Sequence, residues 1–284
     1  MRWVLALALL AGLSGGTAYG QGDPGRGEYL VAAGGCIGCH TEDTKDAAPF
    51  AGGRALETPF GTFYGPNITP DPQAGIGRWQ ESDFINAMRR GLRPDGAHYF
   101  PAFPYTSFTG IMDADLADLW AYLKTLPPSS RASRPHELRF PFGLRILMGP
   151  WKWLFFKEGP FRTDSARAGD VDRGAYLVRA LAHCDECHTP RNFLGVLQRD
   201  RHLAGVPGGD GKGVPNITPT RLGKWSDEEL REVLSSGIAP DFDSVNKTMS
   251  EVVENTTSKL TPGDLDAVIA YLRTLVPLPE PARK

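Results

Sequence analysis

Two copies of one short motif, Cys-x-x-Cys-His, use every cysteine of this 284-residue chain. The first copy is Cys36, Cys39 and His40, and the second begins at Cys184. Structural disulfides are one interpretation, but two intervening residues close a small strained ring, and a chain of this length can bury a core without such staples. A thioredoxin-like redox pair would sit in a βαβ pattern, and no Val/Ile-rich strand flanks either motif.

The histidine that ends each motif separates the two remaining interpretations. A four-thiolate zinc site could take both cysteine pairs, but the pairs lie 148 residues apart and zinc would not require the histidines. A c-type haem uses all three residues, because the thiols bond covalently to its vinyl groups and the imidazole binds its iron. We therefore predict two covalently bound haem c groups. Cys36 and Cys39 would hold the first, with His40 as its iron ligand, and Cys184 and Cys187 the second, with His188 as its iron ligand.

The N-terminus has the layout of a secretory signal. One arginine precedes an apolar run from Trp3 to Leu13, and small residues follow as far as Gly20. The run is too short to span a bilayer comfortably, although a retained N-terminal anchor is the alternative. We predict that residues 1–20 are a signal peptide and that the mature chain is periplasmic.

The composition narrows the class of protein further. A formal net charge of −2 provides no basic field for nucleic acid, so we expect no nucleic-acid partner. The 33 glycines and 24 prolines predict long ordered loops between short helices.

The context of the motif also recurs, which indicates tandem duplication of one domain. "GEYLVAAGGCIGCHT" at 27 resembles "GAYLVRALAHCDECHT" at 174, and "GPNITPD" at 65 resembles "VPNITPT" at 214. "GRWQESDFINAMRRGL" at 77 resembles "GKWSDEELREVLSSGI" at 223, and "DADLADLWAYLKTL" at 113 resembles "PGDLDAVIAYLRTL" at 262. We predict a mainly α fold with an N-terminal domain over 21–127, a linker over 128–165 and a C-terminal domain over 166–284.

Each repeat predicts three helices separated by loops. The first covers about 25–34 and 172–182, and the middle one begins at 81–83 and 226–228. The last begins near Asp113, and near Thr261 in the second repeat. The Gly-x-Tyr before each motif would let the first and last helices cross closely. The two Asn-Ile-Thr sequences match glycosylation sites, but their place in the repeat favours structural turns.

Each half resembles a class I cytochrome c domain. The whole mature chain resembles the exported di-haem cytochromes related to cytochrome c subunits of membrane-bound alcohol and gluconate dehydrogenases. "TPFGTFYGPNITPD", "GIGRWQESDFINAMRRG" and "FPAFPYTSF" carry this resemblance. It implies an electron carrier between a periplasmic dehydrogenase, as donor, and a downstream cytochrome or oxidase, as acceptor. A peroxidase-like di-haem enzyme and a gas-binding haem sensor are the alternatives.

The resemblance also implies a methionine as the sixth iron ligand, from the loop before the last helix. Met249 has that position in the second half. In the first half Phe103 takes the matching position, counted from Gly91 and Gly237, and phenylalanine cannot bind iron. Met112 is then the expected ligand, with His98 as the alternative and five-coordinate iron as a third outcome.

Two further features have sequence-level interpretations. Trp79 and Trp225 recur where a class I tryptophan donates its indole N–H to a haem propionate, and Arg54, Arg90 and Arg93 could neutralise propionates. Residues 142–161 concentrate tryptophan and phenylalanine. We predict that this segment packs between the two domains. The alternative is a docking surface for a membrane or a partner protein.

Overall fold

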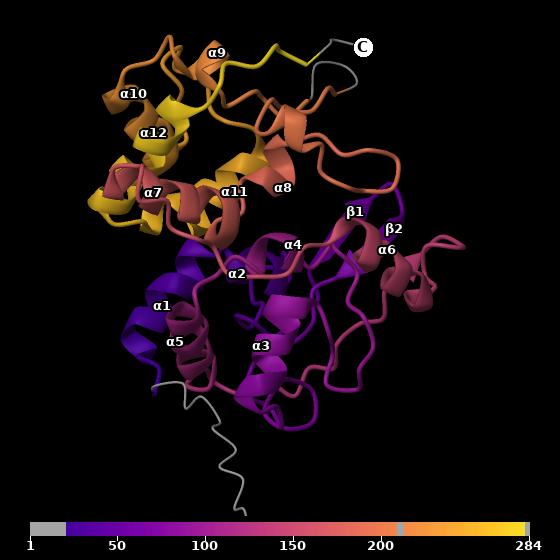
Figure 1. The fold of residues 1–284 in the computed structure, drawn as a ribbon. Helices are drawn as coiled ribbons and strands as arrows, with labels where there is room; N and C mark the ends of the chain where they lie inside the picture. The colour runs from indigo at the N-terminus through magenta and orange to yellow at the C-terminus, as the bar shows by residue number, and fades with distance from the viewer. Residues whose placement is uncertain (1–20, 209–212, 282–284) are drawn as a thin grey trace, which may run out of the picture.

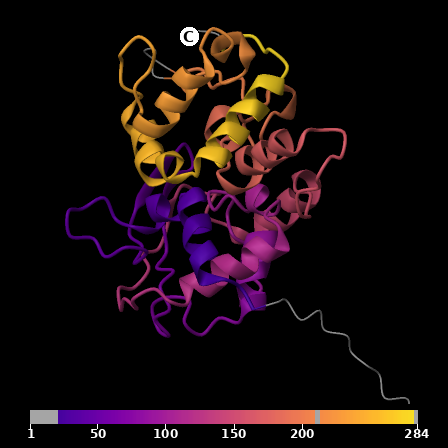
Figure 2. The same ribbon diagram turned by 90° about the vertical axis from the view of Figure 1, so that its left-hand side faces the viewer.

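The computed structural model describes residues 21–208 and 213–281, so the predicted signal peptide lies outside the described residues. Its N-terminal half, drawn from indigo to magenta, lies directly against its C-terminal half, drawn from orange to yellow (Figures 1 and 2). Helices and long loops make up nearly all of both halves. The predicted mainly α fold is therefore confirmed.

Corresponding helices follow one another in the two halves. The first half contains α1 (Pro24–Ala33), α2 (Cys36–His40), α3 (Glu81–Arg90), α4 (Tyr105–Phe108) and α5 (Asp113–Leu123). The second half contains α7 (Gly169–Tyr176), α8 (Asp185–His188), α9 (Pro219–Leu222), α10 (Asp227–Ser236), α11 (Lys247–Asn255) and α12 (Pro262–Thr274). Between them lies α6 (Met148–Phe155), preceded by a short 3-10 turn, and two more such turns lie at Arg199–Arg201 and Thr257–Lys259.

The helix starts follow from local capping, as the sequence predicts. The Ser226 side chain accepts from Glu229 N at the start of α10, and the Glu229 carboxylate accepts from Ser226 N in return. Thr261 caps α12 in the same way, accepting from Asp264 N, with Pro262 in the first turn. These contacts satisfy backbone N–H groups that the helix itself leaves without partners.

Two glycines allow the first and last helices of each half to cross in close contact. The most extensive contacts between helices join α1 with α5 and α7 with α12. A Cβ atom on Gly27 would lie 2.0 Å from the Asp118 carbonyl oxygen, and one on Gly174 would lie 1.9 Å from that of Ala267. The predicted reason for Gly-x-Tyr is thus confirmed, because any side chain at these positions would push the helices apart.

One inserted residue explains the main difference between the two first helices. Tyr29 and Tyr176 are 147 residues apart, whereas Cys36 and Cys184 are 148 apart. The second half absorbs the extra residue in a π-helical turn over Leu177–Leu181, where Ala182 N donates to Leu177 O five residues back. The helix predicted over 172–182 is therefore two segments, and the Cys-x-x-Cys-His motif keeps its place relative to the last helix.

A small sheet, which the sequence did not reveal, occurs beside the first half. Strand β1 (Ala55–Thr58) pairs with β2 (Gly61–Tyr64), and β2 pairs with β3 (Glu137–Leu138), in an antiparallel order β1-β2-β3. Because β3 belongs to the predicted linker, this pairing fastens the start of the linker to the outside of the first half.

The predicted packing of the linker between the domains is largely wrong. Trp153 is 84% exposed and Ile146 is 81% exposed. Phe156 and Phe161 do pack inward, against Tyr105 and Tyr176 respectively. The linker runs along the outside because direct contacts between the halves fill the space that it would need.

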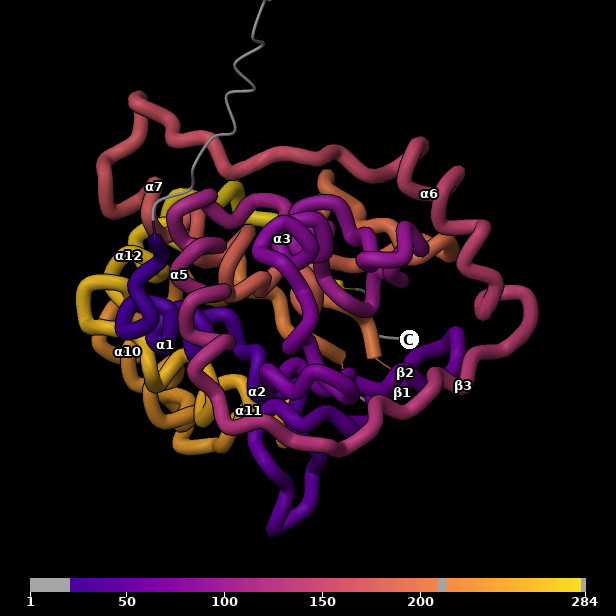
Figure 3. The backbone as a smooth tube through the Cα atoms, turned by 90° about the horizontal axis from the view of Figure 1, so that it is seen from below, coloured from indigo at the N-terminus to yellow at the C-terminus, as the bar shows by residue number. Residues whose placement is uncertain are grey.

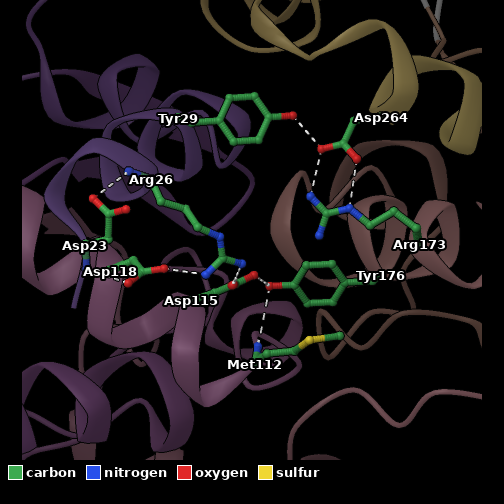
Figure 4. Close-up of polar contacts among 9 residues, drawn as sticks. All are labelled: Asp23, Arg26, Tyr29, Met112, Asp115, Asp118, Arg173, Tyr176 and Asp264. Carbon is green, nitrogen blue, oxygen red and sulfur yellow. Dashed lines mark hydrogen bonds and ion pairs between the residues drawn. The ribbon is translucent and has the colours of Figure 1, made fainter. Parts of the chain in front are cut away.

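A reciprocal pair of tyrosine–aspartate hydrogen bonds joins the two halves (Figure 4). Tyr29 of α1 donates to Asp264 near the start of α12, at 2.5 Å. Tyr176 of α7 donates to Asp115 near the start of α5, also at 2.5 Å. Each half thus sends a tyrosine from its first helix to the last helix of the other half.

The same tyrosines cap those helices. Tyr29 Oη accepts from Thr261 N and Tyr176 Oη accepts from Met112 N, both at 3.4 Å. Burial and the nearby Asp115 carboxylate raise the pKa of Tyr176, so its hydroxyl keeps the proton that it donates. Each tyrosine hydroxyl therefore accepts a hydrogen bond from a backbone N–H and donates one to a carboxylate.

Arginines complete both sites from within each half. Arg26 forms ion pairs with Asp115 and Asp118, and Arg173 donates two hydrogen bonds of 2.8 and 2.7 Å to Asp264. Burial tends to raise the pKa of Asp264, but the bonds from Arg173 and Tyr29 outweigh it and lower that pKa. Asp264 is consequently held as a carboxylate.

An apolar cluster surrounds these polar contacts and runs through both halves. Ile111 and Leu177 are fully buried in it, as is the ring of Tyr176. Gly110 lies so close to Ala180 that an added Cβ would be 2.9 Å from the Ala180 Cβ. The two halves therefore form one packed body.

We predict that Tyr176→Phe destabilises the holo-protein by about 1–3 kcal/mol, because it leaves the buried Asp115 carboxylate with one partner fewer. Tyr29→Phe should cost less, since Asp264 keeps both bonds from Arg173. Denaturant unfolding, followed by haem absorbance, measures both. Tyr122→Phe is the control, because the Tyr122 hydroxyl has no hydrogen-bond partner among the described residues. Equal losses in all three variants would contradict the proposed role of the interface.

Candidate functional site

Each predicted iron-binding histidine has one ring nitrogen fixed by a proline carbonyl. His40 Nδ1 lies 2.7 Å from Pro66 O, and His188 Nδ1 lies 2.9 Å from Pro215 O. A carbonyl oxygen can only accept, so Nδ1 carries the hydrogen in both rings and the Nε2 lone pair is free. This is the tautomer that a histidine needs in order to bind a metal through Nε2.

The two Pro-Asn-Ile-Thr turns hold those carbonyls in place. Asn67 is 3% exposed and donates to the carbonyls of Ser129 and Arg131, while its own Oδ1 accepts from Thr69 N. Asn216, fully buried, accepts from Thr218 N and donates to the Leu278 carbonyl. Such buried asparagines confirm that these sequences are structural turns.

The loop that returns from each histidine is also shared. Gly52 N donates to His40 O at 2.7 Å, and Gly205 N donates to His188 O at 2.8 Å. Both glycines have a positive φ, and a Cβ on either would lie 2.6 Å from the backbone nitrogen of the following Pro-Asn turn. Close backbone approach therefore fixes the histidine from a second direction.

The cysteines have the environment of inert thiols. None of the four is disulfide-bonded. Burial raises the pKa of Cys36 and of Cys184 to about 12, whereas reactive cysteines have a lowered pKa. Among the described residues, no three His, Cys, Asp or Glu side chains gather as a metal-ligand cluster. The geometry thus favours neither thiol redox chemistry nor a shared zinc site.

The second motif contacts the first half directly across the interface. Glu186, inside the second motif, accepts hydrogen bonds from Thr106 at 3.1 Å and from Ser107 at 2.6 Å, both on α4. Burial and the nearby Cys187 thiol raise the pKa of Cys39, which places one cysteine of each motif in the same neighbourhood. The α4 segment of the first half thereby contacts the attachment motif of the second.

The converse contact is present as well. Helix α11 of the second half packs against α2, which is the first attachment motif. Arg54 donates to Glu251 of α11 at 2.6 Å, and a Cβ on Gly35 would lie 2.9 Å from Thr256 Oγ1. Each predicted sixth-ligand loop therefore packs against the attachment motif of the other half.

The structure places the predicted sixth-ligand residues in different settings. Met249 is half-buried on α11, a helix where the sequence predicted a loop; Asn246 caps it and accepts from Met249 N. Met112 is the N-cap residue of α5, and its side chain packs against the core. His98 is half-buried, with Nδ1 3.2 Å from Lys152 Nζ of α6. Its pKa is lowered by burial and by the Lys152 charge.

The structure supports the register that matches Phe103 with Met249. Gly91 and Gly237 both end a helix in the left-handed conformation. Each then accepts a hydrogen bond eight residues later, from Tyr99 N and from Val245 N. Phe103 itself packs edge-on against the ring of Phe108, within the core of the first half.

The predicted propionate residues occupy equivalent positions. Trp79 N donates to Ile76 O, and Trp225 N donates to Leu222 O, in matching turns before α3 and α10. Both rings are half-buried against the core. The three arginines are ion-paired among the described residues, with partners Glu251 and Asp43 for Arg54, Glu158 for Arg90, and Asp95 for Arg93.

Tyr105 is a site residue that sequence reasoning missed. Its hydroxyl is buried without a hydrogen-bond partner among the described residues. Burial raises its pKa, with a further contribution from Glu186 of the second motif. A buried polar atom of this kind requires a partner, which a bound group with oxygen or nitrogen atoms could supply. Together with the free Nε2 atoms and the paired thiols, it makes the residues present compatible with haem c.

The comparisons with known proteins agree with this geometry. The cytochrome c family model matches residues 25–127. A "Diheme cytochrome c-type" protein of Cereibacter sphaeroides is 47% identical over 93% of this chain and 88% of its own length. One of the nicotinate dehydrogenase subunits of Pseudomonas putida is 42% identical, and the fructose dehydrogenase cytochrome subunit of Gluconobacter japonicus is 39% identical, each over 88% of this chain. The match covers only 21% and 52% of those two longer proteins.

We predict that Asn216→Ala destabilises the holo-protein by about 1–3 kcal/mol for each buried group that it leaves unpaired, namely Thr218 N–H and the Leu278 carbonyl. Asn192→Ala is the matched control, because Asn192 accepts from Leu194 N and Val196 N on an exposed loop where water can replace it. Denaturant unfolding compares them. Equal effects would show that the buried turn does not support His188.

Proposed function

The chain belongs to the family of di-haem c-type cytochromes, and we propose that it relays electrons from a periplasmic dehydrogenase to a downstream cytochrome or oxidase. Haem c, when bound, supplies reversible one-electron chemistry at iron. The protein itself would hold two haem c groups, determine their surroundings and provide the surfaces that partner proteins contact. The observation that carries the proposal is the pair of attachment motifs, each with a histidine whose Nδ1 is fixed by a proline carbonyl so that Nε2 is free.

The residue roles within this proposal follow the repeat. The four cysteines anchor the two groups, and His40 and His188 bind iron through Nε2, with Nδ1 held by the proline carbonyls. Trp79 and Trp225 donate to propionates. The working units are residues 21–127 and 166–284, joined by 128–165 and preceded by a signal peptide over 1–20.

Two considerations support an electron carrier with a dehydrogenase as its donor. The relatives include cytochrome subunits of fructose dehydrogenase and of quinone alcohol and gluconate 2-dehydrogenases. In addition, the pKa values of His40 and His188 are lowered, mainly through desolvation. Both rings therefore remain neutral at physiological pH, which suits them to bind iron rather than to exchange protons with a substrate.

We assign Met249 as the sixth ligand in the second half and Met112 in the first. Met249 stands at the position that the shared glycine register gives to Phe103 in the first half. Met112 packs against the same core as Phe103, whereas the Nδ1 atom of His98 is engaged by Lys152. His98, whose ring nitrogen contacts Lys152 of α6, is therefore less suited to bind iron than Met112, which packs against the core.

We predict that Met249→Ala lowers one of the two reduction potentials and opens that iron to carbon monoxide, because a thioether ligand favours the reduced state. Met112→Leu should do the same to the other potential, and His98→Ala should alter neither. A redox titration with optical detection, repeated under carbon monoxide, reads all three. Met148→Ala, in the half-buried start of α6, is the control.

The opposite pattern would reassign the first ligand. If His98→Ala shifts a potential and Met112→Leu does not, His98 binds iron. If the unmutated protein already binds carbon monoxide at one iron, that iron is five-coordinate.

The relay itself is testable in the bacterium that carries the gene. Deleting the gene should abolish oxygen uptake by membranes with one of four substrates named by the relatives' enzymes, namely fructose, gluconate, ethanol or nicotinate, because electrons can no longer leave the dehydrogenase. The wild-type gene should restore uptake, and a Cys184→Ala, Cys187→Ala double variant should not. Unchanged uptake with every substrate, together with hydrogen peroxide turnover or gas binding by the purified protein, would favour the peroxidase or sensor alternative.

A further inference from the structure

The linker presents large apolar side chains to solvent along residues 139–157, which we call the linker surface. Phe140 is 86% exposed, Ile146 is 81%, Trp153 is 84% and Leu154 is 60%. Phe142, Leu144 and Leu147 are also more than two-fifths exposed, and Phe155 is 38% exposed. Scattered exposed apolar residues are normal, but a concentration of this size on one short segment marks an interaction site.

The charges of the same segment have one sign. Between Arg139 and Lys157 there are four basic residues and no aspartate or glutamate, although acidic residues exceed basic ones in the whole chain. Arg139 and Lys157 are exposed at the two ends. Arg145 and Lys152 are half-buried near the middle, where no carboxylate forms an ion pair with either of them in the described structure.

Neighbouring residues extend the surface beyond the linker. Phe142 packs edge-on against Phe60, with ring centres 4.9 Å apart. Trp151 Nε1 donates to Leu194 O at 3.0 Å, which brings in a loop of the second half where Phe193 is 86% exposed. The linker surface therefore bridges both halves.

The position of the segment is peripheral. Helix α6 and the chain that leads to it from β3 lie at the outer edge of the molecule in two perpendicular views (Figures 1 and 3). The charges of Lys152 and Arg145 are directed to backbone carbonyls at the base of the segment, those of Arg90 and His98. Lys152 and Arg145 thus hold the segment against the first half, while its apolar side chains are exposed to solvent.

We propose that the linker surface binds the interfacial region of a membrane that contains anionic lipids. Exposed tryptophan, phenylalanine and leucine beside lysine and arginine are the combination that favours the boundary between lipid headgroups and acyl chains. The exposed Arg139 and Lys157 can attract the anionic headgroups, because long basic side chains reach outward along apolar surface. The choice of a lipid surface rests on charge complementarity, because the segment from Arg139 to Lys157 has four basic and no acidic residues.

The size of the surface indicates the kind of association. Helix α6 has 8 residues, and no helix in the described ranges is long and apolar enough to cross a bilayer. A short apolar helix with a few cations gives reversible binding that weakens with salt, since its electrostatic part is screened. Such binding would confine the cytochrome to the membrane surface without fixing it there.

Vesicle sedimentation of the mature holo-protein, residues 21–284, tests the proposal. Vesicles of phosphatidylcholine with phosphatidylglycerol should bind the protein at low salt, and vesicles of phosphatidylcholine alone should bind it more weakly. A Trp153→Ser, Leu154→Ser double variant should bind the anionic vesicles about tenfold or more weakly, because both side chains are exposed and apolar. An Arg139→Gln, Lys157→Gln variant should lose most of the preference for anionic lipid.

Phe242→Ser is the matched control, because Phe242 is 90% exposed in the second half and lies outside the linker surface. It should bind vesicles as the unmutated protein does, and all variants should keep the haem spectrum. Absence of binding at low salt, or equal loss in Phe242→Ser, would overturn the proposal. So would linker variants that bind vesicles normally but no longer associate with a dehydrogenase, since the surface would then be a protein interface.

Discussion

The hydrogen bonds that Tyr29 and Tyr176 make across the interface hold the two halves in register. Each tyrosine stands on the helix that leads into a Cys-x-x-Cys-His motif, seven residues before the first cysteine in one half and eight in the other. Each hydrogen bond is accepted by an aspartate in the first turn of the other half's last helix. The two motifs are therefore positioned by the same contacts that join the halves. In an electron carrier this matters more than any single side chain, because the protein contributes spacing and environment while the cofactor carries the chemistry.

This interface is polar at its centre and apolar around it. The Asp115 side chain is 1% exposed, and burying its charge is tolerated because Arg26 and Tyr176 both bind it. Asp264 has the same kinds of partner, Arg173 and Tyr29, yet is more open to water. Buried polar pairs of this kind add little net stability over apolar packing, but a shifted register would leave two carboxylates without partners. The polar contacts at the interface therefore favour a single arrangement of the two halves.

Local sequence signals were enough for much of this structure. The caps at Ser226 and Thr261, the close crossing at Gly27 and Gly174, and the buried turns at Asn67 and Asn216 each depend on a few neighbouring residues or on the repeat. The β2–β3 pairing, the contact of Glu186 with α4 and the tyrosine bonds join segments that lie far apart in sequence, and no local pattern encodes them. The π-helical turn was readable in principle, because the one-residue change in repeat offset precedes Cys184. The outward linker was mispredicted because apolar composition alone does not say which surface is already filled.

The two halves have diverged where their symmetry was not needed for assembly. The attachment motifs, the proline carbonyls and the tyrosine contacts have counterparts in both halves, but the residues at the predicted sixth-ligand position do not match. Phe103 and the unpartnered hydroxyl of Tyr105 occupy the first loop, as far as the described residues show, and the second has Met249 on a capped helix. The basic apolar linker is also attached mainly to the first half, through β3, Arg145 and Lys152. Within the proposed relay, these differences make the surroundings of the two haem sites and their access to partners unequal, and such an inequality can give electron flow a direction.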